Sequence, residues 1–262
     1  MNETFKGLFE MVGVRRLVPH LEIDGSVDLP EEIEAEAQAI RRDLARNQQH
    51  ALIEVTASNI RSDPMSLVCR SCDYAAIRAM RNSGGKPKIV SAGAVVTCSE
   101  RGQVLLHHRS RENVDTMKGR LHILGGAYMD DTPGMGNDAG DLSFTAAREM
   151  FEEAGVFNEP PAKWPALVSW ETPTGFFQFI YLGVDVPEIQ VKRQHGYPEG
   201  TVRLVDLQEL ESLLVEGKWV DSGRAAILAW LAFGAPCTGR KKFGQRKARA
   251  IYKRVLKQIQ TS

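Results

Sequence analysis

The sequence predicts an α/β fold with α+β character, in which helices flank a mixed sheet. Short apolar runs rich in β-branched and aromatic residues alternate with amphipathic stretches of helical length. The chain has 262 residues, of which 43% are hydrophobic and 25% are charged. That length and composition suit a soluble globular protein with one elaborate domain or two smaller ones.

Residues 1–87 are expected to form a smaller α+β extension. The stretch 29–49 predicts a helix, because a proline and several acidic residues stand in its first turn and arginines follow, as the helix dipole favours. A strand is expected at 51–57, and Asp73 is a candidate cap for the helix that follows it. The glycine-rich stretch 82–88 marks a boundary. The role of the extension stays open between a dimer interface and a wall of a binding pocket.

Residues 88–235 form the second expected domain, which carries most of the strand-like sequence. Apolar runs separated by turns predict strands, and two amphipathic stretches near its end predict helices. The expected strands are 89–99, 103–110, 165–171 and 175–186, and the expected helices are 205–217 and 222–234.

Residues 236–262 are expected to form a basic C-terminal helix. No acidic residue follows Asp221, although the whole chain balances 33 basic against 33 acidic residues. One side of the helix is apolar, which favours docking on the domain with a solvated basic rim. Binding of RNA or of an acidic partner is the alternative use of this charge. The apolar side comprises Ala248, Ile251, Tyr252, Leu256 and Ile259.

A further helix is expected at 143–155, where the string REMFEEAGV crowds three glutamates around an arginine. At 100° per residue, Glu149, Glu152 and Glu153 gather on one side of this helix. Carboxylates at this spacing repel one another unless cations lie among them. Oxygen ligands favour Mg²⁺ or Mn²⁺, so the pattern predicts a metal site, with a solvated acidic face as the alternative. The opposite, apolar side is expected to pack on the sheet and comprises Phe144, Ala147, Met150, Phe151 and Ala154, with Gly155 ending the helix.

This string resembles the signature of the Nudix hydrolase family, G-x5-E-x7-R-E-U-x-E-E-x-G-U, in which U is a bulky aliphatic residue. The second half of the signature is matched at every specified position, and a GG pair lies upstream at 125–126. The resemblance covers roughly residues 88 to 235 and implies an α/β/α sandwich with a mixed sheet. The matched positions are Arg148, Glu149, Met150, Glu152, Glu153, Gly155 and Val156.

The resemblance also implies roles for these residues. Glu152 and Glu153 correspond to the principal ligands of Mg²⁺ or Mn²⁺, and Glu149 to a further ligand or a water-activating base. Arg148 would orient the carboxylates, and the carbonyl of Gly126 would be an additional ligand. Many members recruit a glutamate from a downstream loop. Glu199, just before an expected strand and helix, is the candidate, with a plain loop glutamate as the alternative.

The first half of the signature is not matched. Twenty-one residues separate Gly126 from Arg148, which is longer than the signature allows. Counting back from Arg148 places Gly140 where the family has a glutamate. Asp141 and Asp130 are the candidate replacements, and the inserted residues form either a loop over the site or a surface excursion.

The implied reaction is hydrolysis of a phosphoanhydride in a nucleoside diphosphate linked to another group, such as a sugar or an ADP-ribose-like moiety. Arg109 and Arg111 are candidates to bind phosphates bidentately. Trp170, Phe176 and Phe177 flank an expected turn and are candidates to stack on a base or sugar, with core packing as the alternative.

Other functions stay open. A partial likeness to the coenzyme A pyrophosphatase element around residues 105–126 and the basic tail give limited support to coenzyme A and RNA-cap substrates. A Nudix-fold module could bind a nucleotide without cleaving it. An isomerase on this fold would need a catalytic cysteine, for which Cys98 is the candidate.

The remaining features indicate a cytoplasmic protein with reduced thiols. The first residues lack a signal-peptide pattern, no apolar run reaches the length of a membrane span, and four cysteines do not form a disulfide scaffold. Cys69 and Cys72 are expected to be buried and inert, and the histidines show no ligand spacing. We expect a small-molecule substrate, no membrane partner, and a possible homodimer.

Overall fold

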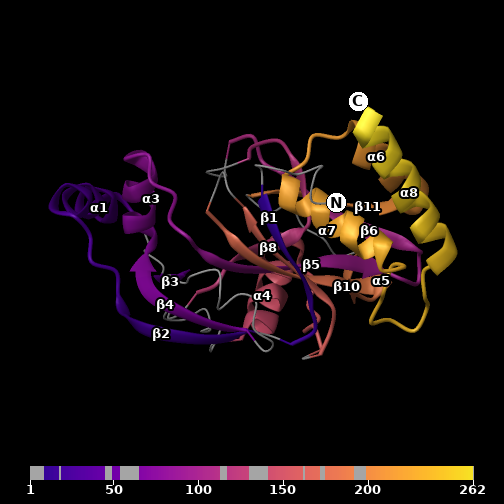
Figure 1. Cartoon of the computed structure of the whole chain (residues 1–262), viewed down its shortest axis with the longest axis horizontal. Coiled ribbons are helices and arrows are strands. Elements are labelled where there is room, and N and C mark those ends of the chain that lie inside the picture. Colours follow the sequence, from indigo (N-terminus) through magenta and orange to yellow (C-terminus); the bar gives the residue numbers. More distant parts are fainter. Residues whose placement is uncertain are drawn as a thin grey trace.

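The computed structural model describes residues 9–17, 19–44, 49–53, 65–112, 117–129, 141–161, 163–171, 175–191 and 199–261. This part of the chain forms a large mixed sheet with helices on both faces and a smaller sheet with two helices at one end (Figure 1). The predicted α/β class is confirmed.

The larger sheet has the order β1-β9-β10-β5-β6-β11, with β7 added to β6 and β8 added to β5. Strand β10 runs parallel to β5 and antiparallel to β9, so the sheet is mixed. Each strand expected between residues 89 and 186 is present, within a residue or two of its predicted ends. The bounds are β1 (Phe9–Arg15), β5 (Val90–Cys98), β6 (Gln103–Arg109), β7 (Leu121–His122), β8 (Leu124–Ala127), β9 (Ala166–Glu171), β10 (Phe177–Asp185) and β11 (Gly200–Asp206).

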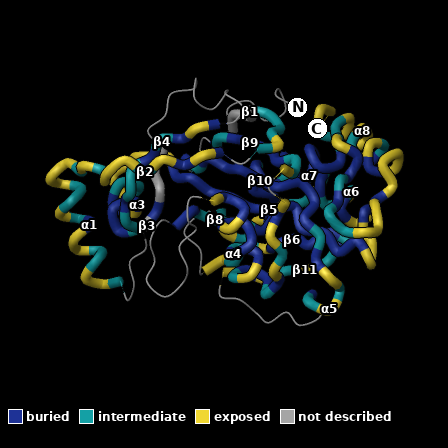
Figure 2. The backbone as a smooth tube through the Cα atoms, turned by 90° about the horizontal axis from the view of Figure 1, so that it is seen from below, coloured by how far each residue is buried: buried dark blue, intermediate teal, exposed yellow. Residues whose placement is uncertain are grey.

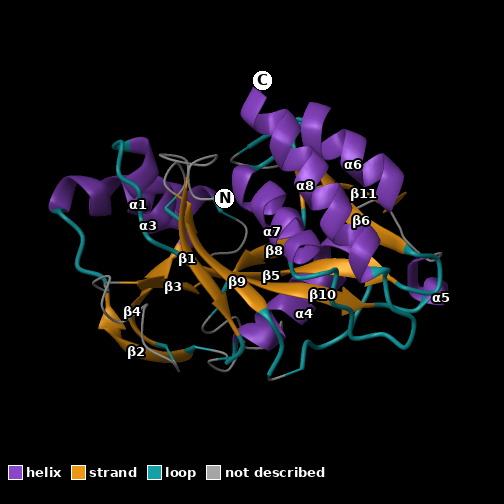
Figure 3. Cartoon of the chain, turned by 45° about the vertical axis from the view of Figure 1, so that its right-hand side comes forward, coloured by secondary structure: helices purple, strands orange, loops and turns teal. Residues whose placement is uncertain are grey.

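Side-chain alternation along the strands divides the core into two layers. In β5, Ala92 and Ala94 pack on the side of α4 (Leu142–Ala154), whereas Val95 packs on the opposite side. That opposite side is covered by α7 (Asp221–Ala232) and, next to the last strand, by α6 (Leu207–Glu216), with α8 (Gln245–Thr261) packed on both helices (Figure 3). The arrangement is an α/β/α sandwich, and its most deeply buried segments lie in the sheet (Figure 2).

The helices around this sheet begin and end close to the predicted residues. The chain after β11 enters α6 (Leu207–Glu216) because Asp206 caps it, accepting hydrogen bonds from the backbone of Gln208 and Glu209. A short helix, α5 (Glu188–Val191), follows β10.

The C-terminal helix α8 (Gln245–Thr261) docks on α6 and α7, as predicted. Ala248 and Ile251 are buried in the contact, as predicted. In the next turn Val255 is the buried residue, whereas Leu256, which was predicted to be buried, is only half-buried. Arg254 on the outer side donates two hydrogen bonds to Glu211 of α6. Among the described residues, no helix is long and apolar enough to cross a membrane.

The smaller sheet lies at the other end of the molecule and has the order β2-β4-β3 (Figure 1). Its strands are β2 (His20–Ser26), β3 (Gln49–Ile53) and β4 (Ser66–Asp73), and its helices are α1 (Glu31–Asp43) and α3 (Tyr74–Asn82).

The three predictions made for this region have different outcomes in the structure. The cap is confirmed, because Asp73 Oδ1 accepts a hydrogen bond of 2.7 Å from the backbone of Ala76. The helix expected at 29–49 is shorter, ending at Asp43, and Gln49 already begins a strand. Residues 54–57 of the expected strand lie outside the described residues.

Strand β1 crosses the expected domain boundary. It pairs antiparallel with β9 and forms the edge of the larger sheet, so residues 9–15 complete the second domain and not the extension. Leu67 and Cys69 of β4 also share the core layer that contains α4. The division into 1–87, 88–235 and 236–262 stays a prediction, with this strand as a qualification.

Candidate active site

The helix α4 carries the acidic string, and both of its ends are fixed by local interactions. At its start, Asp141 Oδ1 accepts a hydrogen bond of 2.8 Å from the backbone of Ser143. At its end, Gly155 adopts the left-handed conformation with φ 61°. Because Asp141 is the cap and does not line the cavity described below, its proposed use as the missing signature carboxylate is not supported. Asp130 lies outside the described residues.

The buried side of α4 differs from the predicted one. Ala147, Met150 and Ala154 are buried as expected, but Phe144 and Phe151 are exposed, the latter by 57%. The helix is rotated so that Arg148 and Glu153 face inward instead. Both find polar partners on the sheet, which makes their burial tolerable.

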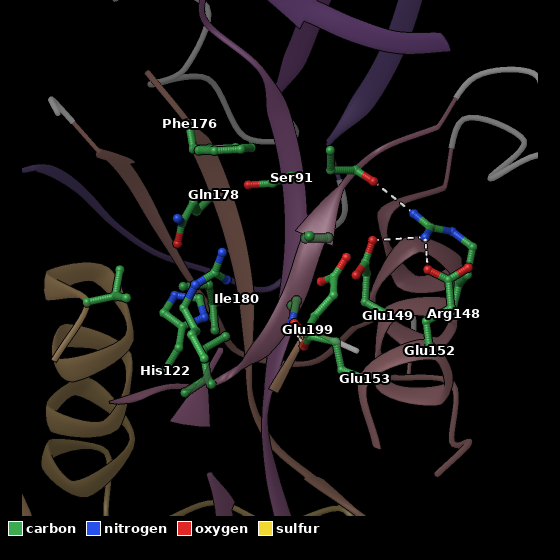
Figure 4. A pocket seen from close by; sticks show the side chains of 18 of the residues that line it. Ser91, His122, Arg148, Glu149, Glu152, Glu153, Phe176, Gln178, Ile180 and Glu199 are labelled. Atoms are coloured by element: carbon green, nitrogen blue, oxygen red, sulfur yellow. Dashed lines mark hydrogen bonds and ion pairs between the residues drawn. The ribbon is translucent and has the colours of Figure 1, made fainter. Parts of the chain in front are cut away.

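Arg148 joins the acidic side of α4 to strand β8. Its Nη1 donates to Glu149 Oε1 at 2.8 Å and to Glu152 Oε2 at 2.9 Å, and its Nη2 donates to the carbonyl of Ala127 at 2.8 Å (Figure 4). The guanidinium therefore holds two carboxylates in place and ties the helix to the strand.

Glu153 points toward the sheet and is only 3% exposed. Its Oε2 accepts a hydrogen bond of 2.9 Å from the backbone of Gly125, and its Oε1 lies 3.0 Å from His107 Nδ1 without the alignment of a hydrogen bond. His107 is fully buried, whereas His108 on the other face of β6 is exposed. The sequence analysis missed His107, since only the pairing of β6 with its neighbours brings it beneath α4.

The glycine pair in β8 allows the helix to approach the strand. A Cβ atom on Gly126 would lie 2.5 Å from the carboxyl carbon of Glu149, and one on Gly125 would lie 2.6 Å from the Cα of Gly93. The sheet therefore requires glycine at 125, where the close atoms belong to the backbone, whereas a side chain at 126 would displace the Glu149 carboxylate.

A cavity of about 430 Å³ opens in front of these residues. It lies where β5 exchanges neighbours: residues 91–94 pair with β8, and residues 96–98 pair with β6. That size is typical of a small-molecule site. The predicted site residues that line it are Arg109, Gly126, Arg148, Glu149, Glu152, Glu153 and Glu199.

Glu199 comes to the cavity from the loop before β11. Its carbonyl accepts a hydrogen bond of 2.7 Å from the backbone of Ser110, and Gly200 next to it pairs with Arg109. The downstream loop thereby brings a fourth carboxylate to those of α4, as Figure 4 shows.

Three predicted substrate-binding residues do not line the cavity. Arg111 is exposed and lies against Gly119. Phe177 is fully buried in the core layer on the α4 side, so it cannot stack on a ligand, and Trp170 packs edge-on against it with Lys88 over its ring. The alternation along β10 places Phe176, the neighbour of Phe177, in the cavity wall instead.

Negative charge exceeds positive charge in this half of the cavity. Four carboxylates face it with two guanidinium groups, Arg148 and Arg109, and Arg109 Nε is buried without a hydrogen-bond partner among the described residues. Burial raises the pKa of Glu149 well above its ordinary value, against the influence of Arg148 and with that of the other carboxylates. Burial and the charge of Glu153 also raise the pKa of Glu199.

The carboxylates do not converge on one point as they stand. Within the described residues, no group of three His, Cys, Asp or Glu side chains is placed to hold a metal ion. The contacts give the reason, since Arg148 engages Glu149 and Glu152 while Glu153 turns toward Gly125 and His107.

The other half of the cavity is formed by the sheet and by the N-terminal region. His122 is buried, which lowers its pKa to about 3, so its imidazole is neutral. His50 of β3 and Tyr74 of α3 line the cavity from the extension, whose role the sequence left open. The sheet contributes Ser91, Glu171, Phe176, Gln178 and Ile180. The sequence analysis singled out only Phe176 among these residues, because the others do not form a recognisable motif in the sequence.

The four cysteines are free and buried, as predicted for Cys69 and Cys72. Burial raises the pKa of Cys72 to about 12, which makes its thiol inert. Cys98 does not line the cavity, so the isomerase alternative loses its candidate residue.

Comparison with known proteins finds similar solved structures at low similarity. No family model matches the chain, and no curated protein does. Similar solved structures include a MutT protein from Methanosarcina mazei Go1, with 22% identity, a TM-score of 0.37, and coverage of 52% of this chain and 88% of that one. A NUDIX hydrolase from Nitrosomonas europaea has 15% identity and a TM-score of 0.39, covering 59% of this chain and 91% of that one.

A third similar structure is a bifunctional NMN adenylyltransferase/ADP ribose pyrophosphatase from Francisella tularensis, complexed with AMP and Mn ion. It has 14% identity and a TM-score of 0.39, and the match covers 61% of this chain and 45% of that one. These overlaps are limited and carry no argument, so the functional argument rests on this chain's own helix α4 and the sandwich around it.

Proposed function

We propose that this protein is a metal-dependent hydrolase of a phosphoanhydride bond, acting on a nucleoside diphosphate linked to another group. One observation carries the proposal: four carboxylates, from α4 and from the loop before β11, face one cavity together with two arginines. A phosphoanhydride is a dense anion, and it would bind beside carboxylates only if cations accompany it.

The residues present suit Mg²⁺ or Mn²⁺. The donors are hard oxygen atoms, and their negative charge exceeds that of the guanidinium groups beside them. Glu152 and Glu153 would be the principal ligands, with Glu149 and the carbonyl of Gly126 as further ones. When bound, such an ion neutralises phosphate charge and lowers the pKa of coordinated water.

The protein side chains supply the remaining functions. Glu149 would accept a proton from the attacking water, an effect typically worth about 10²–10⁴-fold, and Glu199 faces the same space as a second candidate base. Arg109, with its buried and unpartnered Nε, would donate hydrogen bonds to a phosphate. Arg148 would position Glu149 and Glu152, which it already contacts.

A second candidate is a nucleotide-binding module without catalysis. The observation that favours it is the absence of three converging metal-binding side chains within the described residues. The two candidates differ in what they require of Glu152, since hydrolysis needs its carboxylate to bind a metal ion and nucleotide binding alone does not.

A screen of diphosphate compounds tests the proposal. Nucleotide sugars, ADP-ribose, dinucleoside polyphosphates, coenzyme A and capped RNA would be incubated with Mg²⁺ or Mn²⁺, and products would be followed by chromatography. We expect cleavage of at least one nucleoside diphosphate derivative, abolished by EDTA. Binding without cleavage across the panel would select the second candidate. A homodimer and a cytoplasmic location stay predictions.

A further inference from the structure

The C-terminal helix α8 presents a stripe of basic side chains on its exposed side. At 100° per residue, the buried residues Ala248, Ile251 and Val255 lie on one side of the helix, and four basic residues lie on the opposite side. At 1.5 Å per residue this basic stripe is about 17 Å long. Figure 1 shows α8 at the end of the molecule opposite the smaller sheet. The members of the stripe, all exposed, are Arg246, Arg249, Lys253 and Lys257.

The basic stripe has no acidic partner within the described part of the chain. Arg254, on the side of α8 that faces α6, pairs with Glu211, whereas none of the four stripe residues forms an ion pair with a described residue. Helix α1 shows how an exposed helix usually balances its charge. Its acidic residues precede its basic ones, and Glu34 pairs with Arg41. Exposure to solvent alone therefore does not explain a helix with charge of one sign.

The stability of the helix does not explain the stripe either. The first turn of α8 holds Arg246 and Lys247 and no acidic residue, although the helix dipole disfavours cations at that end. Lys253 and Lys257 stand four residues apart, where like charges destabilise a helix. A bound polyanion would relieve both effects, because its negative groups would lie among the cations.

An exposed aromatic ring lies next to α8. Phe233 follows the last residue of α7 and is 48% exposed. The next residue, Gly234, contacts α8, since a Cβ atom there would lie 3.2 Å from Gln245 Cγ and 3.5 Å from Arg249 Nε. Proteins that bind single-stranded nucleic acids combine these two features, because phosphates pair with the cations and bases stack on the ring.

Other polyanions fit this surface less well. A bilayer takes up the apolar side of an amphipathic helix, and that side of α8 is buried against α6 and α7. A duplex keeps its bases stacked on one another and offers none to Phe233. An acidic peptide would neutralise the stripe but would bring no base to the ring.

We propose that the basic stripe and Phe233 form a binding surface for single-stranded nucleic acid, either RNA or DNA. Phosphates would lie along the stripe, and a base would stack on Phe233. Neither the stripe nor Phe233 lines the cavity beside α4, and α8 packs with the core layer on the other face of the sheet. The surface is therefore separate from the proposed active site, and the proposal holds with or without hydrolysis.

Fluorescence anisotropy of labelled strands tests the surface. Full-length protein would be titrated into oligouridylate, oligothymidylate and a duplex, each of about twelve nucleotides, and into polyglutamate of equal charge. We expect at least one single strand to bind at least about tenfold more tightly than the duplex and polyglutamate. The two single strands then distinguish RNA from DNA. No binding, or binding of the duplex or polyglutamate as tight as that of the single strands, would overturn the proposal.

A pair of charge variants locates the phosphates. Arg246→Gln/Lys253→Gln removes two cations of the stripe, and the control Arg42→Gln/Lys163→Gln removes an exposed arginine and lysine elsewhere. Each phosphate contact of a single strand contributes about 0.7 to the slope of log K against log salt concentration, so the stripe variant should lower this slope by about 1.4. We expect its affinity to fall at least about tenfold, with no change in the control. An equal loss in both variants would overturn the proposal.

The contribution of the ring is tested by Phe233→Ala. Loss of one stacked base should weaken binding of the single strand by about fivefold or more and leave the salt dependence unchanged. Phe157→Ala is the control, because that ring is 50% exposed and lies beyond the end of α4. Thermal unfolding curves check the fold of each variant. An unchanged affinity in Phe233→Ala, or the same loss in Phe157→Ala, would reject the stacking.

Hydrolysis assays separate this proposal from the proposed function. Arg246→Gln/Lys253→Gln should cleave the best small substrate of the screen at the wild-type rate, and Glu152→Gln should still bind the single strand. Strand binding that depends on the stripe, in a protein that cleaves nothing, would keep the surface and reject the hydrolase. Loss of strand binding in Glu152→Gln would place the strand in the cavity and overturn the separate surface.

Discussion

The two halves of the cavity are built in opposite ways. On one side, Arg148, Glu149, Glu152 and Glu153 come from two turns of a single helix, and Arg148 pairs directly with Glu149 and Glu152. On the other side, Ser91, Gln178 and Glu171 come from three different strands of the sheet. The helical half is dense in charge and its arginine is paired with two of its carboxylates, whereas the side chains of the sheet half are neutral apart from Glu171.

This difference separates two tasks that one site must perform. Hydrolysis of a phosphoanhydride requires charged side chains at fixed distances from the phosphate groups, and successive turns of a helix hold side chains in this way. Recognition of the rest of a substrate requires shape and a few hydrogen bonds, which a sheet face can present at its edge. Changes in the helical half should therefore alter the rate, and changes in the sheet half should alter binding and stability.

The largest effect is expected for the two principal ligands. Glu152→Gln and Glu153→Gln each keep the volume but remove the charge, and each should reduce metal-stimulated hydrolysis by more than about a hundredfold, since even partners of metal ligands contribute 10–100-fold. The measurement is the initial rate with the best substrate of the screen at saturating Mg²⁺. Full activity in either variant would contradict the assignment, and Glu216→Gln, an exposed residue of α6, is the control.

Gly126→Ala should lower the rate of hydrolysis without lowering the stability of the fold. The added methyl group would lie 2.5 Å from the carboxylate of Glu149, which is the mobile end of a side chain and can move aside. We expect kcat to fall by about a hundredfold because the base is misplaced, with little change in melting temperature. Gly244→Ala has ordinary space around it and should be active. Unchanged kcat in Gly126→Ala would show that Glu149 need not stand beside β8.

His122, in the sheet half, should make the stability of the protein depend on pH. Burial lowers the pKa of His122 to about 3, so the unfolded chain takes up a proton near pH 6.5 that the folded protein does not. Its contribution to stability is full above pH 6.5 and is lost as pH falls toward 3, at about 1.4 kcal/mol per pH unit.

Urea unfolding of His122→Gln at pH 7, 6 and 5 measures this effect. The variant should lose less stability than the wild type between pH 6 and pH 5. His108→Gln, at an exposed position, is the control. Parallel curves for wild type and His122→Gln would contradict the burial of a neutral imidazole.

The smallest effect distinguishes Ser222 of α7 from Ser169 of β9. Ser222→Ala removes the donor to the buried Glu171 and should lower the free energy of unfolding by about 1–2 kcal/mol. Ser169→Ala removes a hydroxyl group that has no partner within the described part of the chain, so the change should be close to zero or stabilising. Chemical denaturation measures both, and an equal loss in the two variants would show that Ser169 has a partner.

The same contrast explains what the sequence could predict. The helical half was predictable because Glu149, Glu152 and Glu153 are close in the chain, and a 3.6-residue period converts that spacing into one face. The pairing of β9 with β10 was also predictable, because only a few residues separate the two strands in the sequence. His107 and Gln178 could not be found in this way, since their roles depend on which strands become neighbours.

The errors have similar causes. Phe144 and Phe151 were predicted to be buried because their side chains are apolar. In the structure they are exposed, and Arg148 and Glu153 face the sheet instead. The hydrogen bonds that Arg148 and Glu153 form with β8 stabilise this orientation of the helix. Phe177 and Phe176 were indistinguishable in sequence, since neighbours in a strand face opposite sides and the pattern does not say which side holds the ligand.

Binding of Mn²⁺ tests the central claim most directly. Electron paramagnetic resonance titration of the full-length protein, in wild type, Glu152→Gln, Glu153→Gln and the Glu216→Gln control, counts bound ions without any substrate. We expect wild type and control to bind the ion, and both α4 variants to lose that binding. Equal binding in all four proteins, or no binding to the wild type, would contradict a metal site on α4.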